Sequence, residues 1–266
     1  MEFKERRYPA KFLPMGAVVT ASGTGAEMNN GAVITNEQTK QKAGVLGAYS
    51  GFAILDPAYT MTVPKQQVIS GAFDTLSHCM ETYFGSPRQT ILSDEIAEAV
   101  MRNVIRDIRV LLKNIEDMNA RSELMWASAM AENGILKIGK VTDFQAHQIE
   151  HQLGAYTDCN HGQGLAVIHP VLYRHMYQDG ADQFARFAKN VWGISEEGKT
   201  KEELAEAGVQ ALADFIKEIE LPSTFTEMGI TDKSVLKNVA DTCNITAGCC
   251  KKLSREEIFE ILEECW

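Results

Sequence analysis

The feature that most constrains this chain is the helical spacing of its apolar residues, which persists from about residue 66 to the last residue. In QVISGAFDTLSHCMETYF and KEELAEAGVQALADFIKEI, for example, apolar side chains recur three and four residues apart, as in amphipathic helices. The first 64 residues differ, because they are rich in Gly, Val, Thr and Ala and favour a few short strands. The sequence therefore predicts a mainly α fold.

These two sequence patterns predict two parts of unequal size. Residues 65–266 should form an all-helical domain of about eight helices. Residues 1–64 hold a handful of short strands, too few to make an independent domain. Within them, GFAILDPAYT is typical of a short buried strand that ends at Asp56 and Pro57.

Four residues predict where helices begin and end. Ser93 and Ser254 precede acidic residues of a first turn and are expected to be N-caps. Gly154 and Gly193 stand where helices are expected to stop, because glycine tolerates the left-handed conformation that follows many helices.

Composition narrows the function classes. The net charge is −10 and no dense Lys/Arg run is present, which argues against a nucleic-acid partner. No window approaches the roughly 18 apolar residues of a membrane helix, and no signal peptide follows Met1. The spacing of the six cysteines fits neither a CxxC zinc pattern nor a small disulfide scaffold. Free thiols and a cytoplasmic location are therefore expected.

The segment AHQIEHQLGAYTDCNHG, residues 146–162, holds three of the six histidines. His147 and His151 are four residues apart on a predicted helix and share one face, and His161 follows ten residues later. Asp74 and His78 repeat the spacing of four on another helix. One carboxylate with several imidazoles is a suitable donor set for Zn²⁺ or Fe²⁺. A metal site is one interpretation of this pattern.

A second interpretation stays open at this point, because His pairs four residues apart often lie on a helix surface or in a core without binding anything. What favours the metal site is that two such pairs occur on apolar helices that carry few other polar residues. His169 and His175, in IHPVLYRH, are expected to be packing or surface residues.

At these residues the sequence resembles the iron-containing (group III) alcohol dehydrogenases, and within them the butanol dehydrogenase branch. The shared pattern is DTLSH, from Asp74, followed by HQIEHQLGAYTDCNHG, from His147. Flanking motifs also match in order: SGTGAE, AVIT, ILDPAYT, GLAVIHP, LPSTFTEMGI and TAGCCKKLSREEIFEIL. The resemblance covers nearly the whole chain.

The resemblance implies a metal-dependent enzyme that interconverts primary alcohols and aldehydes with NAD or NADP. It implies Fe²⁺ or Zn²⁺ as the metal, held by Asp74, His78, His147 and His161. His151 would not bind the metal and would lie near the nicotinamide and the substrate, as the candidate catalytic residue. A histidine that only orients a neighbouring ligand would look the same in sequence.

The resemblance also implies three cofactor-binding residues. Thr20 and Thr24 match two threonines of a family segment that borders the cofactor, and Lys42 matches a lysine that approaches it. Without the family, each threonine could equally well have an ordinary role in a turn or a helix cap as a role in cofactor binding. Lys42 alone would be interpreted as a solvated surface lysine.

The sequence departs from the family pattern in its first part. Full-length members begin with a Rossmann-like α/β domain whose glycine-rich turn, typically Gly-Gly-Gly-Ser, binds the pyrophosphate. These 266 residues contain no such turn, so residues 1–64 are interpreted as a remnant of the dinucleotide-binding domain. We therefore expect cofactor binding and turnover by this chain alone to be impaired. A homodimer or a separate nucleotide-binding chain stays open as a partner.

Two alternatives to a working alcohol dehydrogenase remain. The chain is also consistent with a helical domain that binds metal without catalysis, or with one half of a split enzyme. A related glycerol dehydrogenase ranks lower, because the DCNHGQGLAVIHP context favours the butanol-type branch. Binding of NADPH by metal-loaded protein would separate an enzyme from a domain that only binds metal.

Overall fold

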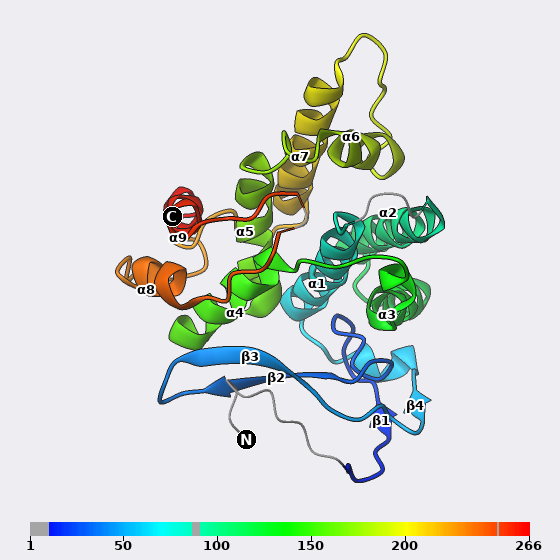
Figure 1. Cartoon of the computed structure of the whole chain (residues 1–266). Helices are drawn as coiled ribbons and strands as arrows, with labels where there is room; N and C mark the ends of the chain where they lie inside the picture. Colours follow the sequence, from blue (N-terminus) through cyan, green and yellow to red (C-terminus); the bar gives the residue numbers. More distant parts are fainter. Residues whose placement is uncertain (1–10, 87–90, 249) are drawn as a thin grey trace.

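The computed structural model describes residues 11–86, 91–248 and 250–266, and within them the chain is mainly helical, as the apolar spacing predicts (Figure 1). The described residues form nine α-helices, where about eight are predicted from the sequence, and two short 3-10 helices. The α-helices are α1 (Lys65–Tyr83), α2 (Ile91–Lys113), α3 (Met118–Glu132), α4 (Gln145–Thr157), α5 (His161–Arg174), α6 (Ala181–Asn190), α7 (Lys201–Glu218), α8 (Val235–Thr242) and α9 (Arg255–Glu264). The 3-10 helices are η2 (Pro57–Thr60) and η3 (Ile135–Lys137).

Four short strands precede the helices and form two separate pairs. They are β1 (Ala17–Val18), β2 (Gly31–Asn36), β3 (Gln41–Leu46) and β4 (Ala53–Ile54). β1 pairs with β4 in parallel, whereas β2 and β3 form an antiparallel hairpin with Gly31 opposite Leu46 and Asn36 opposite Gln41. The hairpin runs along α4, below it in Figure 1, so that one face of this helix lies against strands.

Several local predictions agree with the structure. Ser254 caps α9, and its hydroxyl accepts the Glu257 amide while the Glu257 carboxylate accepts the Ser254 amide, in a capping box. Gly193 adopts a positive φ of 70° just after α6. Both features are set by residues close in sequence, which is why the sequence contains enough information to predict them.

Three local predictions were wrong, two of them because of a contact from elsewhere in the chain. Ser93 lies inside α2 and is not an N-cap, and its hydroxyl donates a hydrogen bond to the Ile138 carbonyl at 3.1 Å. Gly154 lies inside α4, where the absence of a Cβ leaves room for the Lys42 ammonium. The strand in GFAILDPAYT is β4, and it is exposed where a buried strand was expected, with Ile54 46% exposed.

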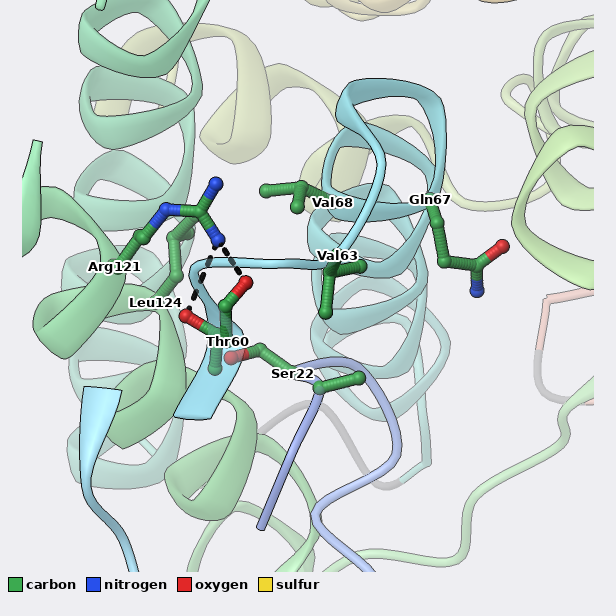
Figure 2. A pocket seen from close by; sticks show the side chains of 8 residues that line it. Ser22, Thr60, Val63, Gln67, Val68, Arg121 and Leu124 are labelled. Carbon is green, nitrogen blue, oxygen red and sulfur yellow. Dashed lines mark hydrogen bonds between the residues drawn. The ribbon is translucent and has the colours of Figure 1, made fainter. Parts of the chain in front are cut away.

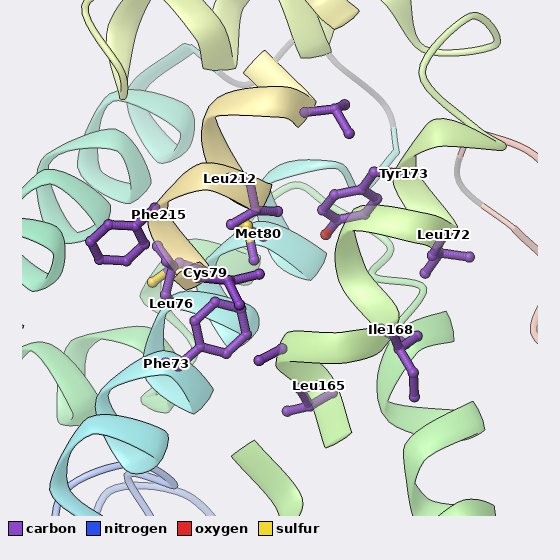
Figure 3. Packing of buried hydrophobic residues seen from close by; sticks show 14 of the residues in the cluster. Phe73, Leu76, Cys79, Met80, Leu165, Ile168, Leu172, Tyr173, Leu212 and Phe215 are labelled. Carbon is purple, nitrogen blue, oxygen red and sulfur yellow. The ribbon is translucent and has the colours of Figure 1, made fainter. Parts of the chain in front are cut away.

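The apolar core is built around α1, which is buried over most of its length. Figure 3 shows Phe73, Leu76 and Met80 of α1 packed between side chains of α5 and α7, including Leu165 and Leu212, all fully buried. Burying a side chain of this size stabilises a fold by about 1.5–3 kcal/mol. The position of α1 is therefore tightly fixed relative to α5.

Cys79, Cys159, Cys243 and Cys265 are free thiols, as the cysteine spacing predicts, and Cys249 lies outside the described residues. In the part of the chain that the structure describes, no helix combines the length and the apolar character needed to cross a bilayer.

Candidate metal centre and cleft

The buried helix α1 carries a stripe of ionisable residues. Asp74, His78 and Glu81 lie four and then three residues apart, so they share one face of the helix. All three are at least 91% buried. Ionisable side chains rarely lie so deep in a protein unless they are paired or bind a ligand. This stripe therefore requires partners from other elements.

The partners on one side come from α4. Helix α4 begins after Phe144, whose φ of 55° turns the chain sharply, and its first amide groups point at the Glu81 carboxylate. The amides of Ala146 and His147 donate to Glu81 at 2.7 and 3.3 Å. A carboxylate from α1 thus caps the positive end of α4 and fixes the place of His147.

The start of α5 supplies the last histidine. Asn160 caps α5 by accepting the Gln163 amide, so that His161 is the first residue of the helix. The next residue, Gly162, lies so close to α1 that a Cβ there would approach the Ser70 carbonyl oxygen to 2.1 Å. Because no side chain intervenes, α5 can begin directly against α1 and place His161 beside the stripe of ionisable residues.

The four predicted metal ligands converge around the Asp74 carboxylate. Asp74 Oδ1 lies 3.5 Å from His147 Nε2, 3.5 Å from His161 Nε2 and 3.7 Å from His78 Nδ1. Two ligands that bind one tetrahedral metal at about 2.1 Å are about 3.4 Å apart. The observed spacings therefore suit ligands of a single ion better than direct hydrogen bonds.

The group closest to sharing an ion consists of Asp74, His147 and His161, whose ligand atoms lie within 4.8 Å of one another. His78 stacks on the His147 ring, with centroids 4.5 Å apart, but lies outside this tightest group. Asp74 Oδ1, His78 Nδ1 and His147 Nε2 are buried and have no hydrogen-bond partner. Buried polar atoms are nearly always satisfied, so these atoms fit a bound cation.

His151 lies next to this group. Its ring stacks on that of His161, with centroids 5.5 Å apart, and its Nδ1 is buried without a hydrogen-bond partner. Glu150, His151 and His161 form a second set close enough to hold an ion. His161 presents Nε2 to Asp74 but uses Nδ1 to bind Glu150.

Two buried glutamates that the sequence analysis missed orient the histidines. Glu81 accepts a hydrogen bond from His147 Nδ1, and Glu150 accepts one from His161 Nδ1. In both rings Nε2 is thereby left free to face Asp74. Carboxylate–histidine pairs of this kind fix the tautomer and the ring direction at metal sites. A sequence signal exists, because HCME and HQIE each place a glutamate three residues after a predicted ligand.

The charges in the cluster move the pKa values in opposite directions. Burial lowers the pKa of His147, but Glu81 and Asp74 outweigh burial and raise this pKa to about 10. Burial also lowers the pKa of His161, but Asp74 and Glu150 outweigh burial and raise this pKa to about 9. Burial and the two charged neighbouring histidines lower the pKa of His151 to about 2.

Asp74 is the acidic centre of the cluster. Burial alone would raise the pKa of its carboxyl group, but the three histidines around it hold the pKa well below its ordinary value. Asp74 is therefore ionised at neutral pH. His78 differs from His147, because burial outweighs its partners and lowers its pKa, which keeps this ring neutral.

A cleft of about 740 Å³ opens onto the metal-ligand group from the side of the β2–β3 hairpin. Its walls include Thr24, Lys42 and Glu132, and its floor includes Asp74, His78 and His161. This volume is within the range of small-molecule and cofactor sites. The arrangement can hold a ligand of moderate size against a bound metal.

The loop that carries Thr24 is docked tightly onto the helices. The amides of Gly23 and Gly25 both donate to Ser128 Oγ, at 2.9 and 3.0 Å. Gly25 has a φ of 54°, and a Cβ there would lie 2.6 Å from the Ser128 carbonyl oxygen, so only glycine fits. This docking places Thr24 at the cleft, while Thr20 is exposed and lies outside the residues that line it.

Lys42 of β3 also lines the cleft, but its ammonium group faces a protein carboxylate. Lys42 Nζ lies 3.8 Å from Glu150 Oε2 and close to the position that a Cβ on Gly154 would occupy. The side chain is 19% exposed, in contrast to the solvated lysine that the sequence alone suggests. Lys42 therefore links the hairpin to the group that orients His161.

A second cavity, of only about 10 Å³, lies beside Ser22 and Gln67 (Figure 2). It has room for about one water molecule. In Figure 2 Arg121 reaches from α3 and donates to the carbonyl and hydroxyl oxygens of Thr60, at 2.5 and 3.2 Å. Arg121 also donates to the Ile115 carbonyl at 2.7 Å, so it holds the chain between strands and helices in place.

The sequence and the fold of this chain both match proteins of a known family. Residues 68–266 match the model of the C-terminal part of the Fe-containing alcohol dehydrogenase family, and residues 1–57 match that of the iron-containing alcohol dehydrogenases. The NADH-dependent butanol dehydrogenase A of Clostridium acetobutylicum is 36% identical over 260 residues, which are 96% of this chain and 67% of that protein. The NADPH-dependent aldehyde reductase YqhD of Escherichia coli is 32% identical over 225 residues, 84% of this chain and 58% of that protein.

A solved structure agrees with these relatives. The crystal structure of NADH-dependent butanol dehydrogenase A from Thermotoga maritima matches with a TM-score of 0.90 at 36% identity, over 98% of this chain and 68% of that protein. The chain thus spans about two thirds of the length of the butanol dehydrogenases that it matches. By sequence and by structure, the chain belongs to the iron-containing alcohol dehydrogenase family.

Proposed function

We propose that this chain supplies the metal centre of an NAD(P)-linked alcohol dehydrogenase that interconverts primary alcohols and aldehydes. The observation that carries the proposal is the set of buried ligand atoms without hydrogen-bond partners, on Asp74, His78 and His147. Together with His161 these residues would hold Fe²⁺ or Zn²⁺. The bound metal would act as a Lewis acid, and the nicotinamide would exchange the hydride.

The names of the relatives support the reaction class. One is a butanol dehydrogenase that depends on NADH, and another is an aldehyde reductase that depends on NADPH. We therefore propose a nicotinamide cofactor and a small alcohol or aldehyde as substrate, with NADH and NADPH both open. The cleft supports this proposal, since it leads from the hairpin to the metal-ligand group.

The protein's own side chains would prepare the site before any ligand binds. Glu81 and Glu150 hold the rings of His147 and His161 with Nε2 toward Asp74. Preorganisation of this kind lowers the reorganisation needed when charge develops on the reacting oxygen. Thr24 and Lys42 line the wall where we place the nicotinamide, whereas contact between Thr20 and the cofactor stays a prediction.

We propose that His151 acts beside the metal and is not one of its ligands. Its low pKa, due to burial and the neighbouring histidines, keeps the ring neutral at ordinary pH. A neutral ring can donate a hydrogen bond from one nitrogen and accept one at the other. His151 is therefore suited to orient a hydroxyl group at the site, and weakly suited to act as a general base.

The proposal is tested with a chimera, in which the nucleotide-binding part of the Clostridium acetobutylicum relative precedes this chain. We expect butanal reduction that requires both added Fe²⁺ or Zn²⁺ and NADH or NADPH. The 266 residues alone should turn over at least about a thousandfold more slowly, because positioning of the reacting groups is worth about 7–11 kcal/mol.

The chimera carrying His147→Ala is the control, and it should lose both metal and activity. Butanal reduction that continues unchanged in this variant would contradict the proposed metal centre. A chimera that binds metal and NAD(P)H but never transfers hydride would favour a helical domain that only binds metal.

A further inference from the structure

The outer surface of α2 and α3 carries an apolar groove that the proposed chemistry does not use. The two helices pack against each other and lie at the right edge of the molecule in Figure 1. The groove between them has a volume of about 480 Å³ and shares no lining residue with the cleft. Leu92 of α2 and Trp126 of α3 line it and are 70% and 54% exposed. Large apolar side chains grouped in this way are typical of surfaces that contact other protein.

The groove and the residues around it, which we call the α2–α3 face, are complementary in shape to a second copy of the same face. Leu92, Ile96 and Ala99 follow at spacings of four and three residues and form one apolar stripe along α2. Trp126 lines the same groove from α3. Ala99 is exposed, and its small side chain leaves room for a bulky group of a partner. A copy rotated about a twofold axis near Ala99 would bring its own Trp126 to this groove and receive Trp126 in return.

The charges beside the apolar stripe favour an antiparallel contact of α2 with its copy. Exposed charged residues at spacings of seven, four and seven lie along one side of the helix, and they are Glu95, Arg102, Arg106 and Lys113. In an antiparallel pair, the acidic first half of one helix faces the basic second half of the other. Arg102 donates to the neutral Asn190 carbonyl at 2.7 Å, so this bond leaves its positive charge available to a carboxylate. A parallel pair would instead place like charges opposite each other, which is unfavourable.

We propose that two copies of this chain associate through the α2–α3 face, with α2 antiparallel to its copy and a twofold axis near Ala99. A second copy is the occupant because the face is complementary to itself in both shape and charge, as a twofold contact requires. The contact does not involve the exposed apolar residues of the strands in residues 11–64. It also lies apart from the cleft, so the inference does not depend on the proposed function.

The test measures self-association of the full chain by sedimentation velocity over a range of concentrations, and we expect a reversible dimer. Trp126→Glu should raise the dissociation constant of the dimer at least about thirtyfold, because a central interface aromatic is replaced by a charge. Leu92→Glu should weaken the dimer as well. Tyr49→Glu is the matched control, since Tyr49 is an aromatic residue of the strand part that is 65% exposed, and this variant should keep the dimer.

Two further variants test the antiparallel arrangement. Glu95→Arg should weaken the dimer, because the new arginine would face the basic half of α2 in the copy. Combining Glu95→Arg with Arg102→Glu should restore most of the lost affinity, because the two charges exchange places. All the altered side chains are exposed, so the variants should fold, and circular dichroism checks this.

A chain that stays monomeric at every concentration would overturn the proposal. A dimer that Trp126→Glu and Leu92→Glu both leave unchanged would overturn it too, and dissociation by Tyr49→Glu would then identify the strands as the contact. A double charge variant that associates more weakly than Glu95→Arg alone would overturn the antiparallel arrangement.

Discussion

At the scale of single residues, the site depends on which histidine nitrogen points where. His147 and His161 each donate a hydrogen bond from Nδ1 to a glutamate, and Nε2 of each ring faces Asp74. His151 has no such carboxylate partner and remains neutral. These differences separate residues that look alike in sequence, and they lead to three predictions.

The first prediction separates the ligands from their neighbour. His147→Ala should lose nearly all bound metal, because it removes one of the three groups nearest to sharing an ion. His151→Ala should retain metal content near that of the unaltered chain. Elemental analysis of the two purified variants decides the matter, and equal losses in both would refute the distinction between them.

The second prediction concerns Glu81. Glu81→Gln should weaken metal binding by about 10- to 100-fold, the usual effect of removing a carboxylate that orients a ligating histidine. Glu98→Gln is the matched control, since Glu98 is also buried and hydrogen-bonded but pairs with Tyr83 and Arg186 away from the site. Zn²⁺ titrations would contradict the role of Glu81 if both variants bound metal equally well.

The third prediction is a pH dependence. A metal must displace the protons on His147 and His161, whose pKa values are raised to about 10 and about 9 in the metal-free protein. Both rings are therefore protonated at neutral pH, and proton competition strengthens as the pH falls. Zn²⁺ affinity should rise steeply between about pH 6 and about pH 8, with protons released to the buffer. Calorimetry that shows constant affinity over this range would contradict the assignment.

At the scale of elements, the site requires α4 and α5 to approach α1 very closely. Gly162 makes the approach of α5 possible, because any Cβ at this position would collide with the Ser70 carbonyl oxygen. The polar stripe of α1 would otherwise remain unpartnered in the core. Helix packing and the placement of His161 are therefore coupled at the first turn of α5.

The fourth prediction follows from this coupling. Gly162→Ala should destabilise the chain by about 1–3 kcal/mol, the usual cost of overpacking, and should weaken metal binding by displacing His161. Gly47→Ala is the control, since its Cβ would make only an ordinary contact at 3.6 Å. Thermal denaturation and Zn²⁺ titration of both variants test this, and a Gly162→Ala chain as stable as the control would count against it.

The helices and their ends also show which structural features can be predicted from the sequence. Helices and the Ser254 cap could be predicted, because their causes lie within a few residues. Ser93 and Gly154 were assigned wrongly, because their partners, Ile138 and Lys42, come from distant segments. The two HxxE patterns were available in the sequence, but the pairing of each glutamate with a histidine of another segment appears only in the fold.

At the scale of the whole molecule, the metal-ligand group belongs to the helical part and the cleft to both parts. The four predicted ligands come from α1, α4 and α5, whose positions are fixed by the apolar core (Figure 3). The strands contribute the outer wall through Thr24 and Lys42. Large exposed apolar residues are frequent in residues 11–64, including Leu13, Tyr49 and Phe52, a pattern typical of surfaces that meet other protein.

We propose that one metal ion is bound jointly by Asp74, His78, His147 and His161. Anomalous diffraction at the metal absorption edge, from crystals grown with Fe²⁺ or Zn²⁺, tests it most directly. We expect a single peak about 2.0–2.2 Å from all four side chains, with His151 unbound. A peak centred on Glu150 and His151, or a peak that His161 does not reach, would contradict it.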